Sequence, residues 1–98
     1  MGELRFTWDA RKARSNRQRH GVSFEEAQTV FLDELAILID DPDASVDEER
    51  FLILGLSAAL RLLTVCHCVR REGDEIRLIS ARRADQYEQQ QYWTRLGR

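Results

Sequence analysis

The sequence predicts an α+β domain in which helices pack on an antiparallel sheet. Two observations lead to this class. Helical patterns lie near the start and at the end of the chain, and three β-rich segments follow one another between them without an intervening helix. The length of 98 residues and the 43% share of hydrophobic residues suit one small core, so we expect a single domain over residues 1–98.

The first predicted elements are a short strand and a basic helix. Residues 4–8 alternate apolar and polar side chains, as strands do, and Asp9 can cap a helix that runs to about His20. Gly21 then offers the left-handed stop that commonly ends a helix. Two alanines are the only apolar residues of this helix and most of the others are basic, so we expect it to present a basic face.

The next segment predicts a second helix with a core-facing side. Ser23 and Glu26 form a capping box, in which the Ser oxygen accepts from a backbone N–H and Glu26 reaches back. Apolar residues follow at helical spacing, and the helix is expected to end near residues 32–33. The apolar run 35–39 predicts a brief strand, and residues 40–45, which hold the only proline, predict a loop.

The second half of the chain is β-rich. Residues 50–56 are nearly all apolar, as in a strand that is buried on both faces. Residues 60–69 and 75–81 flank a turn at 70–74 whose glycine suits a positive φ, so they predict an antiparallel hairpin. The helical pattern returns from Arg82 and predicts a last, exposed helix.

The hairpin predicts a cationic row on one face of the sheet. If Val69 lies opposite Glu75, then His67 lies opposite Arg77, and both share a face with Arg61. Like charges repel across a sheet, so folding alone explains such a row poorly, whereas it suits a phosphate and can stabilise a pentacoordinate phosphorane without a metal. The alternative is that these arginines pair with the acidic middle of the chain.

Charge is segregated along the chain. Residues 1–24 hold six basic and two acidic side chains, residues 25–49 hold ten acids and no base, and residues 50–98 hold nine arginines and five acids. All basic residues but one are arginine, a bias that favours bidentate contacts to phosphate or carboxylate, although GC-rich coding can produce it as well. The two basic flanks point to an anionic partner.

Two blocks of residues carry a resemblance to a known family. The first block holds Trp8-Asp9, His20-Gly21-Val22 and Phe24-Glu25-Glu26-Ala27, and the second is Ile79-Ser80-Ala81-Arg82. With these blocks in one unbroken order from Phe6 to Tyr92, the sequence resembles the BrnT family of bacterial toxins. Three residues depart from the family pattern: Ala10 replaces the usual Pro, Arg19 the common Lys, and Leu60 the common Gly.

The resemblance implies a fold, an activity and a partner. The fold is RelE-like, with a strand and two helices followed by an antiparallel β-meander and a C-terminal helix. The activity is that of a type II toxin, a metal-independent endoribonuclease that cleaves RNA and inhibits translation. The partner is a cognate antitoxin similar to BrnA, with a ribbon-helix-helix DNA-binding domain, which neutralises the toxin in a hetero-oligomer that represses its own operon.

Metal-free RNA cleavage needs groups that stabilise charge on the phosphate and groups that move protons. Arginine serves the first need but stays protonated at neutral pH, so only the two histidines are candidates for the second. The predicted catalytic residues are Arg61, Arg82, Arg77, His67 and Arg19. The alternative for His67 is a hydrogen-bonded structural role. Glu88 and Tyr92 of the last helix are candidates to hold Arg82 or Arg61 in place.

A second group of residues is predicted to contact RNA. These residues are Trp8, Lys12, Arg11, His20 and Arg83. An aromatic ring such as that of Trp8 can stack on a base, but it can equally belong to the core. His20 lies at a helix end, where an imidazole also interacts favourably with the helix dipole.

Neither a metal nor a cofactor is expected. Cys66, His67 and Cys68 suggest zinc, but a second cysteine pair is missing and His67 points away from the two thiols, so buried core thiols are the simpler interpretation. No window approaches the 18 apolar residues of a membrane span, and the N-terminus lacks the apolar segment of a signal peptide, so we expect a soluble cytoplasmic protein.

Two other functions compete with the ribonuclease. One is a non-catalytic RelE-like module that binds an antitoxin or nucleic acid without cleavage, and the other is a nuclease that acts on DNA. Cleavage of RNA in the presence of EDTA distinguishes the three.

Overall fold

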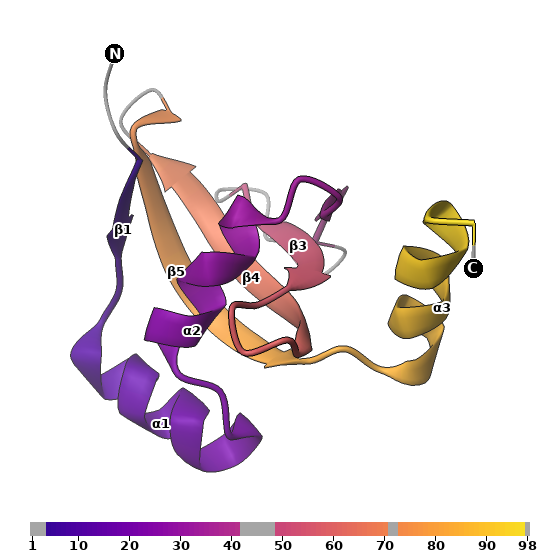
Figure 1. The fold of residues 1–98 in the computed structure, drawn as a ribbon. Coiled ribbons are helices and arrows are strands. Elements are labelled where there is room, and N and C mark those ends of the chain that lie inside the picture. The colour runs from indigo at the N-terminus through magenta and orange to yellow at the C-terminus, as the bar shows by residue number, and fades with distance from the viewer. Residues whose placement is uncertain (1–3, 42–48, 71–72, 98) are drawn as a thin grey trace.

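The computed structural model describes residues 4–41, 49–70 and 73–97, and it confirms the α+β class (Figure 1). Five strands form one sheet in the order β1-β5-β4-β3-β2. The elements are β1 (Arg5–Thr7), α1 (Ala10–His20), α2 (Phe24–Gln28), the 3-10 helix η1 (Thr29–Leu32), β2 (Ile37–Asp40), β3 (Phe51–Leu56), β4 (Leu62–Arg70), β5 (Glu75–Arg83) and α3 (Gln86–Arg95). The predicted loop at 40–45 and the tip of the predicted turn at 70–74 fall largely outside the described residues.

The sheet is mixed, where a purely antiparallel sheet was predicted. Strands β2 to β5 pair antiparallel, but β1 pairs parallel with β5, with Thr7 opposite Arg77. A parallel pair needs a long connection between its strands, and all the other strands and two helices lie between β1 and β5 in the chain. The sequence pattern of a strand does not reveal its direction relative to a neighbour so distant in the chain.

Helix α1 is hydrogen-bonded to the sheet through one side-chain amide. Asp9 caps the helix by accepting from the backbone N–H groups of Arg11 and Lys12, and Gly21 ends it at φ 69°, as predicted. Asn16 is the only buried residue of α1. Its side chain donates to the carbonyl of Ala81 at 2.8 Å and accepts from the Ala81 N–H at 3.0 Å. Since β1 ends at Thr7, the Asn16 amide takes the place of a strand at the open edge of β5.

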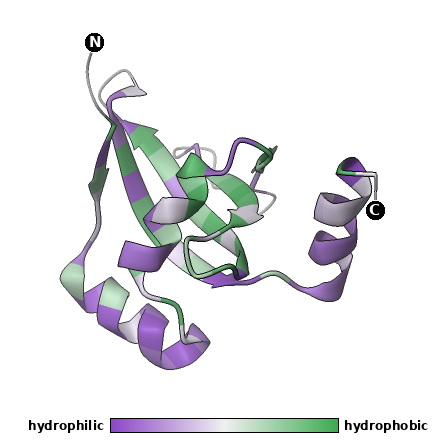
Figure 2. Ribbon diagram, in the orientation of Figure 1, coloured by the Kyte–Doolittle hydropathy of each residue, from purple (hydrophilic) through white to green (hydrophobic). Residues whose placement is uncertain are grey.

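Helices α1 and α2 cover one face of the sheet, and α3 lies away from them (Figure 1). Phe24 and Val30 pack with Ile53 in the larger core, while Tyr92 of α3 packs with Leu54 in a smaller one. Because neighbouring residues of a strand point to opposite faces, α2 and α3 contact opposite faces of β3. Figure 2 shows the hydrophobic strands beside the mainly hydrophilic α1.

The predicted capping box of α2 forms only in part. Ser23 accepts from the Glu26 N–H at 3.0 Å, but the Glu26 carboxylate accepts from the side chains of Arg61 and Ser57 instead of reaching back. The complete capping box of the molecule's described part is at α3, where Asp85 and Glu88 bond reciprocally. The last helix begins there and not at Arg82, which still belongs to β5.

The predicted hairpin register is wrong. His67 lies opposite Leu78, and Arg77 lies opposite Cys68, so His67 and Arg77 point to opposite faces of the sheet. The register shifts between Cys66 and His67, where Ile79 is left without a direct partner as a β-bulge. A slip of one residue moves a side chain to the other face, and hydrophobic pattern alone does not locate a bulge.

Two further features concern the β4–β5 turn and the described helices. Gly73 in the β4–β5 turn has φ 95°, in agreement with the positive φ expected of that glycine. None of the described helices is long and apolar enough to cross a membrane.

Candidate active site

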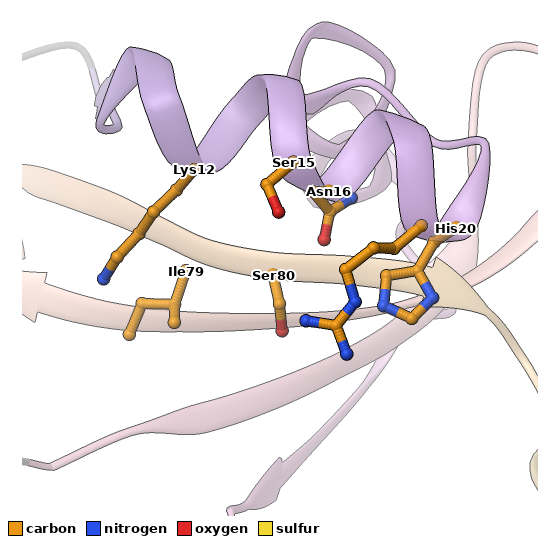
Figure 3. A pocket seen from close by; sticks show the side chains of 7 residues that line it. Lys12, Ser15, Asn16, His20, Ile79 and Ser80 are labelled. Carbon is orange, nitrogen blue, oxygen red and sulfur yellow. The ribbon is translucent and has the colours of Figure 1, made fainter.

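A cavity of about 150 Å³ lies between α1 and the edge of β5, and we name it the α1–β5 cavity (Figure 3). Its lining residues are Lys12, Ser15, Asn16, Arg19, His20, Ile79 and Ser80. The five residues from α1 recur every three or four positions and therefore share one face of the helix. Figure 3 shows Lys12 and His20 reaching from α1 toward the side where Ile79 and Ser80 of β5 lie.

The α1–β5 cavity is electropositive. Lys12, Arg19 and His20 are exposed to solvent there, and no acidic side chain is among the described residues that line it. The described part of the chain also offers no carboxylate within ion-pairing distance of Lys12 or Arg19. This arrangement can bind and stabilise a phosphate.

A second cavity of about 480 Å³ lies on the sheet face that α3 contacts, and we name it the sheet–α3 cavity. Its lining includes Ile79 and Ser80, which also line the α1–β5 cavity, together with Arg82, Tyr87 and Gln91. Consecutive residues of a regular strand point to opposite faces, but a β-bulge redirects one side chain. The bulge at Ile79 therefore explains why both Ile79 and Ser80 line the two cavities. The two cavities therefore adjoin at Ser80.

Arg82 is held in a fixed orientation by Glu88. Its two terminal nitrogens donate to the two carboxylate oxygens of Glu88 at 2.8 and 2.9 Å. Glu88 also accepts from the Thr64 hydroxyl and the Asp85 N–H. Burial alone raises the pKa of the Glu88 carboxyl, but the hydrogen bonds from Arg82, Asp85 and Thr64 outweigh burial and lower the pKa below its usual value. The prediction that Glu88 positions Arg82 is confirmed.

Arg61 lies apart from both cavities. It precedes β4 and donates from Nε to Glu26 at 3.0 Å, and its Nη2 bonds to Glu26 and to the carbonyl of Gly21. The hydrogen bond from Arg61 lowers the pKa of the Glu26 carboxyl. Arg61 thus joins the end of α1 to α2 and to the β3–β4 turn, and the predicted grouping of Arg61 with His67 and Arg77 does not occur.

Two aromatic candidates belong to the core. His67 is 2% exposed and lies 4.9 Å from the ring of Phe31 and 6.0 Å from that of Phe51, centroid to centroid. Burial lowers the pKa of its imidazole. Trp8 packs edge to face on Phe24 at 5.9 Å. Because His67 has almost no accessible surface, we leave it out of the site proposed below.

The other predicted residues do not join the cavities. Arg77 is half-buried on β5, and Arg11 and Arg83 are exposed on α1 and at the end of β5. The predicted site residues did not include the polar neutral side chains that line the cavities, which are Ser15, Asn16, Ser80, Tyr87 and Gln91. Helical periodicity from Lys12 points to the first two, and Ser80 stands in the second block of the family resemblance, whereas Tyr87 and Gln91 gave no such signal.

The described residues contain no group of three or more His, Cys, Asp or Glu side chains able to hold a metal ion. Cys66 donates to Asp41 at 3.4 Å, and burial together with that carboxylate raises the pKa of its thiol to about 12. Cys66 and Cys68 are both buried.

Comparison with known proteins identifies the family. A family model described as "Ribonuclease toxin, BrnT, of type II toxin-antitoxin system" matches residues 8–88. Among solved structures, the fold is similar to that of the ribonuclease toxin BrnT from Brucella abortus, with a TM-score of 0.64 and 21% sequence identity over 85% of this chain and 99% of that chain. Among curated proteins, none matches. The family model spans most of this chain, which therefore belongs to the BrnT family of ribonuclease toxins of type II toxin–antitoxin systems.

Proposed function

We propose that this toxin is a metal-independent endoribonuclease that cleaves RNA at the α1–β5 cavity and thereby inhibits translation. The observation that carries the proposal is the convergence of Lys12, Arg19 and His20 on a hollow without acidic lining residues. Two cations can neutralise the charge that develops on the phosphate, and an imidazole can move a proton near neutral pH. Arg82, held by Glu88 on the far side of Ser80, is a second contact for the RNA.

The proposed reaction uses the 2′-hydroxyl of the RNA as nucleophile. His20 takes the hydroxyl proton, the 2′-oxygen forms a bond to phosphorus, and the bond from phosphorus to the 5′-oxygen breaks. The leaving 5′-oxygen takes a proton from solvent, and a 2′,3′-cyclic phosphate remains. Lys12 and Arg19 stabilise the phosphorane because their charges are already in place before charge develops on its oxygens. His20 is assigned because the other histidine, His67, is buried.

We further propose that the toxin is neutralised by a cognate antitoxin similar to BrnA, with a ribbon-helix-helix DNA-binding domain, in a hetero-oligomer. Membership of a type II family supports an antitoxin partner. The electropositive α1–β5 cavity suits acidic side chains of such a partner as well as it suits phosphate. The element order, with helices before a strand meander, supports the further expectation of a RelE-like fold.

One observation favours the non-catalytic alternative. Two of the predicted catalytic residues, Arg61 and Arg82, are hydrogen-bonded to carboxylates. Neither guanidinium therefore has all of its N–H donors available to a substrate. A binding module that holds an antitoxin or nucleic acid without cleavage needs no proton-transfer group. Cleavage by the purified chain would exclude this alternative.

The test is cleavage of a defined single-stranded RNA by the purified chain in EDTA. We expect His20→Ala to lower the cleavage rate by about 100-fold or more, since general acid–base groups contribute about 10²–10⁴-fold. Lys12→Ala and Arg19→Ala should each lower it by about 10²- to 10³-fold, as the loss of one group that stabilises transition-state charge does. Arg14→Ala is the matched control, because Arg14 is an exposed cation of α1 that does not line the cavity.

Three results would contradict the proposal. Full loss of cleavage in EDTA would show that a metal is required. Equal rates for His20→Ala and Arg14→Ala would place proton transfer elsewhere. Cleavage of DNA at the same rate as RNA would exclude the 2′-hydroxyl as nucleophile.

A further inference from the structure

The sheet–α3 cavity differs in charge from the cavity beside it. Three carboxylates, from Asp41, Asp85 and Glu88, line it together with the two arginines Arg50 and Arg82. Both arginines are engaged with carboxylates, Arg50 with Asp41 at 3.5 Å and Arg82 with Glu88 at 2.8 Å. A phosphate there would meet uncompensated negative charge, so the cavity favours a neutral ligand.

The lining of the sheet–α3 cavity suits a heteroaromatic group. Leu52 and Ile39 supply an apolar surface, while Gln91, Ser80 and Asp85 supply hydrogen-bonding groups. Ligand sites commonly combine apolar walls with a few polar groups in this way, in volumes of about 300–1,000 Å³. The volume of about 480 Å³ lies within that range.

Tyr87 offers an aromatic ring beside this cavity. Its side chain is 67% exposed although it is large and aromatic, and its hydroxyl accepts from Gln91 Nε2 at 3.0 Å. The two residues are four positions apart on α3, so they lie on one helix face. The hydrogen bond restricts the ring, which lowers the entropy lost when another ring stacks on it. Nucleic-acid-binding proteins use exposed aromatic rings to stack bases.

We propose that the sheet–α3 cavity binds a nucleobase of the substrate RNA next to the cleaved phosphate, with Tyr87 stacking on the base and Gln91 orienting Tyr87. This inference rests on the function proposed above. The two cavities adjoin at Ile79 and Ser80, so a phosphate among Lys12, Arg19 and His20 places a neighbouring nucleotide beside the sheet–α3 cavity. The positive cavity then takes the backbone, and the sheet–α3 cavity takes the neutral base and determines which nucleotide is cleaved.

The experiment measures base stacking and cleavage preference separately. RNA that carries 2′-O-methyl groups, and therefore cannot be cleaved by its 2′-oxygen, is labelled with 2-aminopurine at each position in turn and bound to the full chain. We expect one position to lose fluorescence on binding, and Tyr87→Ala to abolish that loss. With unmodified RNA of random sequence, Tyr87→Ala should lower cleavage by about 10-fold and broaden the nucleotide preference at the cleaved bond, since stacking on one aromatic ring is worth about 1–3 kcal/mol.

Matched variants separate stacking from folding. Tyr87→Phe keeps the ring but loses the hydroxyl that accepts from Gln91, so it should retain the fluorescence loss and the preference only in part. Gln91→Ala should weaken both to the same extent as Tyr87→Phe, because it removes the same hydrogen bond. Gln90→Ala is the control on α3, because Gln90 is exposed and does not line the sheet–α3 cavity. Unchanged thermal unfolding of each variant shows that the sheet and α3 remain folded.

Each remaining outcome decides one of the two proposals. If the wild type cleaves RNA but Tyr87→Ala keeps the same preference and fluorescence loss, the base site is overturned and the ribonuclease stands. If the wild type cleaves nothing but the fluorescence loss depends on Tyr87, the base site stands and the proposed activity fails. If Tyr87→Ala weakens binding of the cognate antitoxin and leaves RNA binding unchanged, the cavity belongs to the antitoxin and the base site is overturned.

Discussion

Leu60 adopts a backbone conformation that residues with a side chain rarely take. Its φ is 62°, and its side chain is 78% exposed, so no packing compensates for the conformation. The position is one at which the BrnT resemblance has a common Gly. A left-handed conformation costs a non-glycine residue about 1–2 kcal/mol. The departure from the family pattern therefore has a local cost in backbone energy at the turn between β3 and β4.

Leu60→Gly should raise the free energy of unfolding by about 0.5–1 kcal/mol. Relief of the left-handed strain is worth about 1–2 kcal/mol. This gain exceeds the destabilisation of about 0.5–1 kcal/mol that results from the greater chain entropy of Gly in the unfolded state. Urea denaturation measures the difference. Ala58→Gly is the control in the same turn, because among the described residues other than glycine only Leu60 has a positive φ, and this variant should be destabilised. A Leu60→Gly protein less stable than the wild type would contradict the argument.

Helix α3 is attached to the rest of the molecule mainly through polar contacts. The Tyr92 hydroxyl donates to Asp33 at 2.6 Å, Arg95 donates to the carbonyls of Leu35 and Ala36, and Glu88 binds Arg82. The apolar contribution is the small cluster around Leu54 and Tyr92. Burial and the Asp33 carboxylate raise the pKa of the Tyr92 hydroxyl to about 12, so it remains a donor throughout the ordinary pH range.

Tyr92→Phe should lower the free energy of unfolding by about 1.5–3 kcal/mol, because a hydrogen bond to a charged carboxylate is lost while the ring remains. Denaturation by urea measures the loss, and amide hydrogen exchange should show faster exchange in α3 than elsewhere. Tyr87→Phe on the same helix is the control, with an expected change within about 0.5 kcal/mol for an exposed side chain. Equal stabilities of the two variants would mean that Asp33 does not hold α3.

At the scale of the whole molecule, carboxylates that are buried or partly buried join separate elements of the fold. Glu26 connects α2 to Arg61 and the β3–β4 turn, Asp33 connects the segment after η1 to α3 and to Leu56, and Glu88 connects α3 to Arg82 of β5. The pKa of each of these three carboxyl groups lies below its usual value, because hydrogen bonds to the charged carboxylate lower the pKa by more than burial raises it.

The free energy of unfolding should therefore decrease in two stages as the pH is lowered. Burial of the imidazole holds the pKa of His67 in the folded protein below its usual value of about 6.5, so the unfolded chain binds the extra proton and stability declines as pH falls below about 6.5. The three carboxylates contribute stability above their unfolded pKa values, and that contribution is lost as pH falls below about 4 through their lower folded values. Thermal unfolding between pH 8 and pH 3 measures both stages.

The variant His67→Leu separates the two stages. Removing the imidazole should flatten the pH dependence between pH 7 and pH 5 and leave the loss in acid unchanged. Glu26→Gln should instead reduce the loss in acid, and it should be less stable than the wild type at pH 7 because Arg61 loses its charged partner. A His67→Leu protein with the slope of the wild type between pH 7 and pH 5 would show that this histidine is protonated equally in both states.

The amino-acid sequence by itself determined what depends on nearby residues. Asp9 and Gly21 mark the ends of α1, the alternation at residues 4–8 marks β1, and the basic side chains of α1 recur at helical spacing, because caps and periodicity act within a few residues. The family resemblance rests on such local blocks too. Lys12, Arg19 and His20 could therefore be placed on one helix before their surroundings were known.

Only the tertiary structure decided which cations meet. The register next to the β4–β5 turn, with Val69 opposite Ile76 instead of Glu75, placed Arg77 on the face opposite His67, and hydrophobic contacts from β3 and η1 buried His67 between Phe31 and Phe51. The Glu26 carboxylate, 35 residues away in the sequence, bound Arg61, whereas Glu88 lies six residues from Arg82 and could be named as its partner from the sequence. A side chain changes face with each residue of register, and the partner of Arg61 comes from far along the chain, so both depend on packing that no local pattern encodes.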